Sequence, residues 1–166
     1  MRADAGMAST FPDLSYLTIG IIDDLAFSRT MMRSVLVAAG ANRVEVASDS
    51  TEGWQMICSS RPHLLVLDWQ LKTGSGLDLL RQIRLAAESP NRFMAVLMVT
   101  SFREEHRVQE ALGSGVTAYL AKPFSPNELI LRVKFCVEDR RDFVHGPQYL
   151  GPAIKSFGTD DSVEVE

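Results

Sequence analysis

Cysteine and histidine are scarce in this chain, and their positions exclude several kinds of site. The two cysteines, Cys58 and Cys136, lie far apart and form no C-x-x-C pair. The three histidines show no spacing typical of a metal site or a catalytic pair: His63, His106 and His145. We therefore expect neither a disulfide nor a zinc site, and we interpret both cysteines as free, buried thiols of a protein from a reducing compartment.

An excess of basic residues is also missing. The formal net charge is -4, with 17 Lys and Arg against 21 Asp and Glu, so we expect no direct binding to nucleic acid or to an anionic membrane surface. No apolar run approaches the length of a membrane-spanning helix. Residues 1–15 contain two acids and lack the continuous apolar segment of a signal peptide. These features predict a cytoplasmic protein.

Five short apolar runs recur along the chain, and each is followed by a helical pattern. The runs cover residues 16–22, 43–47, 63–67, 95–99 and 116–120. Four are nearly continuous, as in strands buried on both faces of a parallel sheet, whereas 43–47 alternates and is predicted to be an edge strand. This order predicts an α/β fold, with a doubly wound five-stranded parallel sheet and helices on both faces.

The helix boundaries carry capping signals. An acid follows three positions after each of three candidate N-cap residues, in the pairs Asp49 with Glu52, Ser101 with Glu104, and Ser125 with Glu128. We expect the last helix over about 125–143. The expected domain covers 16–144, after an N-terminal extension over 1–15. Residues 145–166 are interpreted as a tail, docked through Tyr149, Leu150 and Ile154.

Charged and hydroxyl side chains follow four of the predicted strands. They are Asp23, Asp24, Asp68, Thr100 and Lys122. Ligands of open parallel sheets bind at the carboxyl ends of the strands, so we expect these side chains to meet. Clustered carboxylates require a compensating cation, and an all-oxygen site suits Mg²⁺. The pattern predicts a carboxylate that attacks a phosphoryl group beside a metal ion, with Asp68 as the acceptor.

Four segments resemble the signature segments of the receiver domain of two-component response regulators, over about residues 16–144. They are IIDD, LLVLDWQLKTGSGLDLL, VLMVTS and AYLAKPF. The resemblance implies the CheY-like, flavodoxin-like fold, with five helices around strands in the order 2-1-3-4-5. It implies a stand-alone phosphoacceptor signalling protein rather than an enzyme, with no effector domain. The implied phosphodonor is a histidine kinase or a histidine phosphotransfer protein.

The same resemblance implies roles for individual residues. Asp68 would be phosphorylated, and Mg²⁺ would be ligated by Asp24, Asp68 and the backbone carbonyl of Gln70. Asp23 would act largely through a metal-bound water.

Thr100 and Lys122 would hold the phosphoryl oxygens, through a Lys122–Pro123 peptide bond that is cis in many members of the family. Tyr119 would be the switch aromatic that couples to Thr100. Gln70 and Phe102 occupy positions that the family links to the lifetime of the acyl phosphate, and we expect Phe102 to shield the phosphoryl group from water. The surface of the fourth helix, fifth strand and fifth helix, within 101–143, would bind a downstream protein or a second copy of the chain.

Other interpretations remain at this stage. Asp24 could be a helix cap and Asp68 a turn residue, although their joint placement at strand ends argues against coincidence. A phosphatase of the haloacid dehalogenase type needs a second acid two residues after the nucleophile, where this chain has Gln70. A flavodoxin-like FMN binder needs a phosphate loop rich in Ser, Thr and Gly, whereas DDLAFSR is acidic. A phosphorylation-independent scaffold with the same fold stays open.

Overall fold

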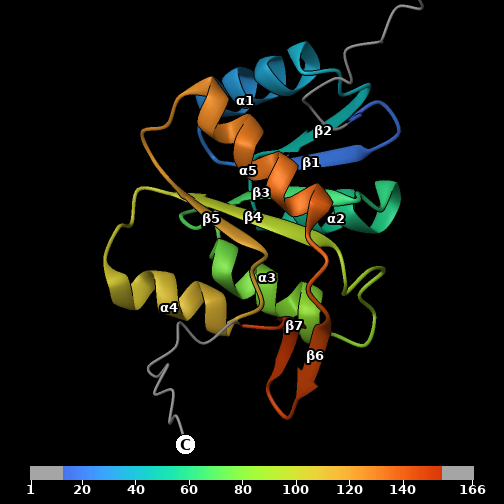
Figure 1. Ribbon diagram of the computed structural model, residues 1–166, viewed down its shortest axis with the longest axis vertical. Coiled ribbons are helices and arrows are strands. Elements are labelled where there is room, and N and C mark those ends of the chain that lie inside the picture. The colour runs from blue at the N-terminus through green and yellow to red at the C-terminus, as the bar shows by residue number, and fades with distance from the viewer. Residues whose placement is uncertain (1–12, 155–166) are drawn as a thin grey trace, which may run out of the picture.

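A computed structural model describes residues 13–154, which form a parallel sheet between two layers of helices (Figure 1). The sheet has five strands in the order β2-β1-β3-β4-β5, as predicted. The strands are β1 (Thr18–Ile22), β2 (Arg43–Ala47), β3 (Leu64–Asp68), β4 (Ala95–Thr100) and β5 (Ala118–Ala121). The helices are α1 (Ala26–Ala38), α2 (Ser50–Ser60), α3 (Gly76–Leu85), α4 (Glu105–Gly113) and α5 (Pro126–Glu138).

The central strands are apolar on both faces because each face of the sheet is covered by helices. β1 and β3 are buried along their whole length, and β2, with its alternating pattern, lies at an edge as predicted. α1 and α5 pack on one face, and α2, α3 and α4 pack on the other. None of the helices within residues 13–154 is long and apolar enough to cross a membrane. This packing fixes the positions of the strand ends that carry the candidate site.

Two of the three predicted helix caps are confirmed. The side chain of Asp49 accepts hydrogen bonds at the start of α2, and Ser125 forms a capping box with Glu128 at the start of α5. The cap at Ser101 is wrong, because α4 begins only at Glu105 and has no side-chain cap. The β4–α4 loop is held differently: the Phe102 N–H donates to the Thr100 hydroxyl. The capping pattern at Ser101 therefore does not start a helix, and the loop instead makes a hydrogen bond to Thr100, the last residue of β4.

The segment after α5 differs from the prediction of a tail. α5 ends at Glu138, and β6 (Phe143–Gly146) and β7 (Tyr149–Pro152) form an antiparallel hairpin that packs near α3 (Figure 1). The predicted boundary at residue 144 thus falls inside β6. Leu150 is buried as expected, whereas Ile154 is half exposed. The predicted tail residues 155–166 and most of the N-terminal extension lie outside the described residues.

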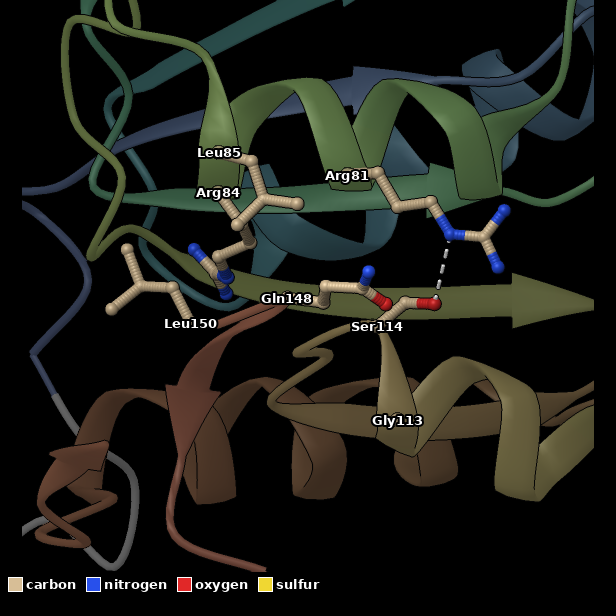
Figure 2. A pocket seen from close by; sticks show the side chains of 7 residues that line it. All are labelled: Arg81, Arg84, Leu85, Gly113, Ser114, Gln148 and Leu150. Carbon is tan, nitrogen blue, oxygen red and sulfur yellow. Dashed lines mark hydrogen bonds between the residues drawn. The ribbon is translucent and has the colours of Figure 1, made fainter. Parts of the chain in front are cut away.

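The buried cation Arg84 anchors the hairpin side of the molecule. Its guanidinium donates to the carbonyl oxygens of Gly115, Arg92 and Met94, and it lies 5.2 Å from the ring centroid of Phe143. Burial lowers the pKa of Arg84 to about 10. A cavity of about 410 Å³ adjoins it between α3, the end of α4 and the β6–β7 turn (Figure 2). The carbonyl partners give Arg84 a structural role, because it joins the last turn of α3 to the α3–β4 loop and to the turn after α4.

The two cysteines differ in exposure, which corrects the expectation that both are buried. Cys136 lies on the buried face of α5. Cys58 is exposed because α2 turns Met56 and Ile57 toward the core and Cys58 toward solvent. Burial also raises the pKa of the Cys136 thiol to about 12, which suppresses its thiolate form.

We expect a thiol-specific disulfide reagent to label one cysteine per native chain and two per unfolded chain. Cys58→Ser should remove the native reaction, and Cys136→Ser should leave it unchanged. Absorbance titration of the released thiolate measures both numbers. Rapid labelling of native Cys58→Ser protein would contradict the assignment of Cys136 to the core.

Candidate functional site

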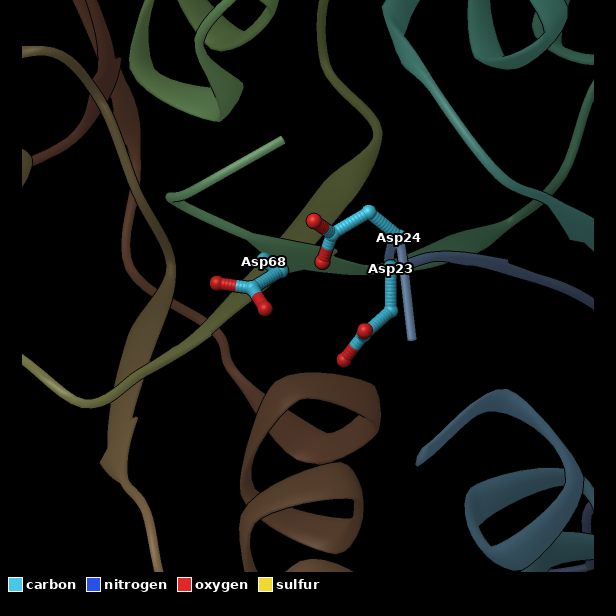
Figure 3. Close-up of side chains that lie close together, drawn as sticks. All are labelled: Asp23, Asp24 and Asp68. Atoms are coloured by element: carbon cyan, nitrogen blue, oxygen red, sulfur yellow. The ribbon is translucent and has the colours of Figure 1, made fainter. Parts of the chain in front are cut away.

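Three carboxylates meet at the carboxyl ends of neighbouring strands. Asp23 and Asp24 directly follow β1, and Asp68 is the last residue of β3, which pairs with β1 (Figure 3). Each of the three acids offers a carboxylate oxygen within 4.8 Å of those of the other two. Asp23 and Asp68 are buried and Asp24 is half-buried, so their mutual repulsion is only weakly screened by solvent. The predicted convergence of the three acids is confirmed.

The two adjacent aspartates have different environments. One Asp23 oxygen accepts from the Leu25 N–H at 2.8 Å, and the other accepts from the Ser28 hydroxyl at 2.6 Å. The Arg29 guanidinium donates to the Asp23 carbonyl at 2.7 Å. Asp23 is thus fixed by the first turn of α1. Ser28 and Arg29 were not predicted from the sequence.

Asp24 has no such role in the fold. The N-cap residue of α1 is Leu25, without a side-chain cap, so the interpretation of Asp24 as a helix cap is wrong. Within residues 13–154 the Asp24 carboxylate makes no hydrogen bond or ion pair. Its charge is therefore available to a cation.

Lys122 bridges the other two acids. Its ammonium lies 2.8 Å from an oxygen of Asp23 and 2.8 Å from an oxygen of Asp68. Burial lowers the pKa of Lys122, but its contacts with the two carboxylates outweigh this effect and the net shift is upward, so Lys122 stays charged. The Lys122–Pro123 peptide bond is cis, as the resemblance implied.

The pKa of Asp68 is raised because burial outweighs the favourable contacts with Lys122 and with the Gln70 N–H. One ammonium thus serves two buried carboxylates, and the third acid nearby adds further negative charge. An additional cation would stabilise the ionised form of Asp68.

The loop after Asp68 requires a glycine. A Cβ atom at Gly76, the first residue of α3, would lie 1.9 Å from the Asp68 carbonyl oxygen. The Gly76 N–H also donates to the Trp69 carbonyl, and Gln70 forms an isolated bridge with Ser75. These contacts fold the loop tightly against the end of β3 and so fix the direction of the Asp68 side chain.

Thr100 and Tyr119 both contact the backbone of Phe102. The fully buried Thr100 hydroxyl accepts from the Phe102 N–H at 3.2 Å, and the Tyr119 hydroxyl donates to the Phe102 carbonyl. Thr100 ends β4, beside the end of β3, and its carbonyl accepts from the Lys122 N–H. Phe102, in the β4–α4 loop, therefore links Thr100 at the end of β4 to Tyr119 on β5.

The side chain of Phe102 belongs to a stack that the sequence did not predict. Its ring meets the Trp69 ring edge to face, with centroids 5.4 Å apart. The Arg107 guanidinium from α4 lies 4.8 Å from the Phe102 centroid and 5.4 Å from that of Trp69. The stack joins the residue after Asp68 to α4. A sequence signal was absent because cation–π partners have no fixed spacing along the chain.

The donor set fits a hard divalent cation. It consists of carboxylate oxygens from three residues, and Mg²⁺ prefers oxygen ligands while retaining several waters. Asp24 carries unpaired charge, and a cation beside Asp68 would stabilise its ionised form against burial, which raises the pKa of Asp68. Both observations favour an additional cation, and an oxygen-only donor set suits Mg²⁺ or a similar hard ion better than zinc.

Comparisons with known proteins agree with the site geometry. Residues 19–134 match the family model described as response regulator receiver domain. The chemotaxis protein CheY of Pseudomonas aeruginosa is 33% identical over 113 residues, covering 68% of this chain and 90% of that protein. The phosphate regulon transcriptional regulatory protein PhoB of the same species is 36% identical over 117 residues, or 70% of this chain.

The solved structure of Vibrio cholerae CheY4 superposes with a TM-score of 0.63 at 26% identity, covering 70% of this chain and 94% of that one. The chain spans about half the length of the PhoB relatives that it matches. The region matched by the family model, residues 19–134, contains all three acids, Thr100 and Lys122. By its sequence, its strand order and this shared region, the chain belongs to the response regulator receiver domain family.

Proposed function

We propose that this receiver takes a phosphoryl group from a histidine kinase or a histidine phosphotransfer protein onto Asp68, in a Mg²⁺-dependent reaction. The single observation that carries the proposal is the convergence of three carboxylates with Lys122 at the ends of β1, β3 and β5. Asp68 is the favoured acceptor because Asp23 is held by α1, whereas within residues 13–154 only Lys122 and a backbone N–H donate hydrogen bonds to the Asp68 carboxylate. The proposed setting is the cytoplasm.

The proposed transfer needs little covalent chemistry from the protein. A carboxylate oxygen of Asp68 would form a bond to phosphorus as the bond from phosphorus to the donor nitrogen breaks, and the electron pair would leave with that nitrogen. When bound, Mg²⁺ would neutralise charge on the phosphoryl oxygens; its proposed ligands are Asp24, Asp68 and the Gln70 carbonyl, with Asp23 acting through water. Lys122 and Thr100 would hold the remaining oxygens.

The proposed output is a conformational change on the surface formed by α4, β5 and α5. The acyl phosphate would carry about -1.5 to -2 charges in place of the single charge of the Asp68 carboxylate, which would draw the Thr100 hydroxyl toward Asp68. Because Thr100 and Tyr119 share Phe102 as a hydrogen-bond partner, movement of Thr100 would shift the β4–α4 loop and Tyr119 together. We propose that a partner protein, or a second copy of the chain, binds the altered surface.

Incubation with acetyl phosphate and Mg²⁺, followed by intact mass measurement, tests the proposal. The wild-type chain should gain one phosphate, and Asp68→Asn should gain none. Asp78→Asn is the matched control, because Asp78 is an exposed acid of α3 that makes only a weak ion pair with Arg81. It should label like the wild type. Failure of the wild type to label would instead favour a phosphorylation-independent scaffold.

A further inference from the structure

The cavity beside the β6–β7 hairpin holds a buried cation that has no anionic partner. This cavity of about 410 Å³ lies between α3, the turn after α4 and the hairpin (Figure 2). Arg84 lines the cavity and is only 1% exposed. Within residues 13–154, no carboxylate forms an ion pair with Arg84. Because an unpaired charge is costly to bury, a negative charge in this cavity would be stabilised.

One donor group of the Arg84 guanidinium is also unused. Nε donates to the Gly115 carbonyl, and Nη1 donates to the carbonyls of Arg92 and Met94. Nη2 is buried and has no hydrogen-bond partner among residues 13–154. The Phe143 ring lies 5.2 Å from the guanidinium carbon, but a ring face is a weaker acceptor than an oxygen atom. Since Nε and Nη1 are taken by the backbone, Nη2 is the donor of Arg84 that remains for a ligand in the cavity.

The other cavity walls combine polar and apolar side chains. The Arg81 guanidinium adds a second positive charge, and its Nε donates to the Ser114 hydroxyl at 3.3 Å (Figure 2). The two ion pairs of Arg81, at 3.4 and 3.5 Å, are exposed and therefore weak. An amide and two apolar side chains complete the walls: Gln148, Leu85 and Leu150. This lining suits a ligand with one negative charge and an apolar part.

We propose that this cavity binds a monocarboxylate with a short aliphatic chain. A carboxylate oxygen would accept from Arg84 Nη2, and the aliphatic chain would contact Leu85 and Leu150. The negative end of α4 opposes an anion here, but it corresponds to roughly half a charge, against the two full charges of Arg84 and Arg81. Phosphate fits less well, because it is more strongly hydrated and the cavity offers few free donors.

The proposed site is independent of the proposed phosphotransfer. Gln148 and Leu150 come from the hairpin, beyond residues 19–134 that match the receiver family. The site therefore belongs to the part of the chain that follows the family domain, and its test needs no phosphodonor.

Calorimetric titration of the full chain with sodium hexanoate, at constant ionic strength, tests the proposal. We expect one hexanoate to bind per chain. Hexan-1-ol lacks the charge and inorganic phosphate lacks the apolar chain, so each should bind at least about tenfold more weakly. The absence of hexanoate binding would overturn the proposal. Equal affinity for hexan-1-ol would show that the cation is not used, and equal affinity for phosphate would show that the aliphatic chain is not; either result would overturn the proposal as well.

Gln148→Glu locates the site, because it places a competing negative charge on the cavity wall. Gln148 is exposed, so the variant should fold, and it should weaken hexanoate binding at least about tenfold. Gln55→Glu is the matched control at an exposed position of α2 that does not line the cavity, and it should bind like the wild type. An unchanged affinity in Gln148→Glu, or an equal loss in both variants, would refute the assignment to this cavity.

Discussion

Asp24→Asn should weaken Mg²⁺ binding by a factor on the order of 10 or more, because it removes a full negative charge from the cation site. Asp24 is the informative acid to change. Asp23 is held by Leu25, Ser28 and Lys122, so its replacement would disturb the fold, whereas Asp24 makes no contact that the fold requires. Quenching of Trp69 fluorescence during Mg²⁺ titration, in a Trp54→Phe background, measures the affinity.

The same variant should be at least as stable as the wild type when a chelator removes divalent cations. Without a cation the three carboxylates repel one another, and Asp24→Asn relieves part of that repulsion. Urea unfolding with and without Mg²⁺ measures both effects. Loss of stability in chelator would show that Asp24 supports the fold, and an unchanged Mg²⁺ affinity would remove it from the metal site.

Gly76→Ala should destabilise the protein by at least about 2 kcal/mol. The new methyl group would meet the Asp68 carbonyl oxygen at 1.9 Å, and backbone on both sides has little freedom to move. The displaced β3–α3 loop should also slow phosphorylation, because this loop fixes the acceptor. Denaturant unfolding and the rate of mass increase with acetyl phosphate measure the two effects.

Gly113→Ala provides the matched control at a helical glycine. No atom lies within 4 Å of a Cβ built there, and the backbone needs no positive φ. Alanine in a helix is favoured over glycine by about 0.5–1 kcal/mol, so this variant should be slightly more stable than the wild type. If both variants had similar stabilities, the close approach of Gly76 to Asp68 would not constrain the loop.

The parallel α/β fold and the convergence of the acids could be predicted because short-range patterns determine them, whereas the strand order was implied by the family resemblance. Continuous apolar runs identify strands buried on both faces, and a parallel sheet brings residues such as Asp24, Asp68 and Lys122 to one edge. The start of α5 was predicted as well, since Ser125 and Glu128 complete their capping box within one turn. In these cases local preference and tertiary structure agree.

Features decided by long-range contacts could not be predicted. Ser101 has the pattern of a helix cap, yet α4 begins only at Glu105, and the loop before it is held by a hydrogen bond from the Phe102 N–H to the Thr100 hydroxyl. The hairpin after α5 depends on α3 and the buried Arg84 to cover its apolar residues, so its own sequence indicated only a tail. Arg107 on α4 contacts the ring of Trp69, which follows β3, and the distance between these residues along the sequence gives no pattern that predicts the contact.

Reductive trapping of the acyl phosphate tests the central claim most directly. Borohydride converts a phosphorylated aspartate to homoserine, and peptide mass spectrometry then identifies the modified position. We predict homoserine at position 68 alone, and only when acetyl phosphate and Mg²⁺ are both present. Homoserine at position 23 or 24, or equal trapping at position 68 in the presence of a chelator, would contradict a magnesium-dependent acceptor at the end of β3.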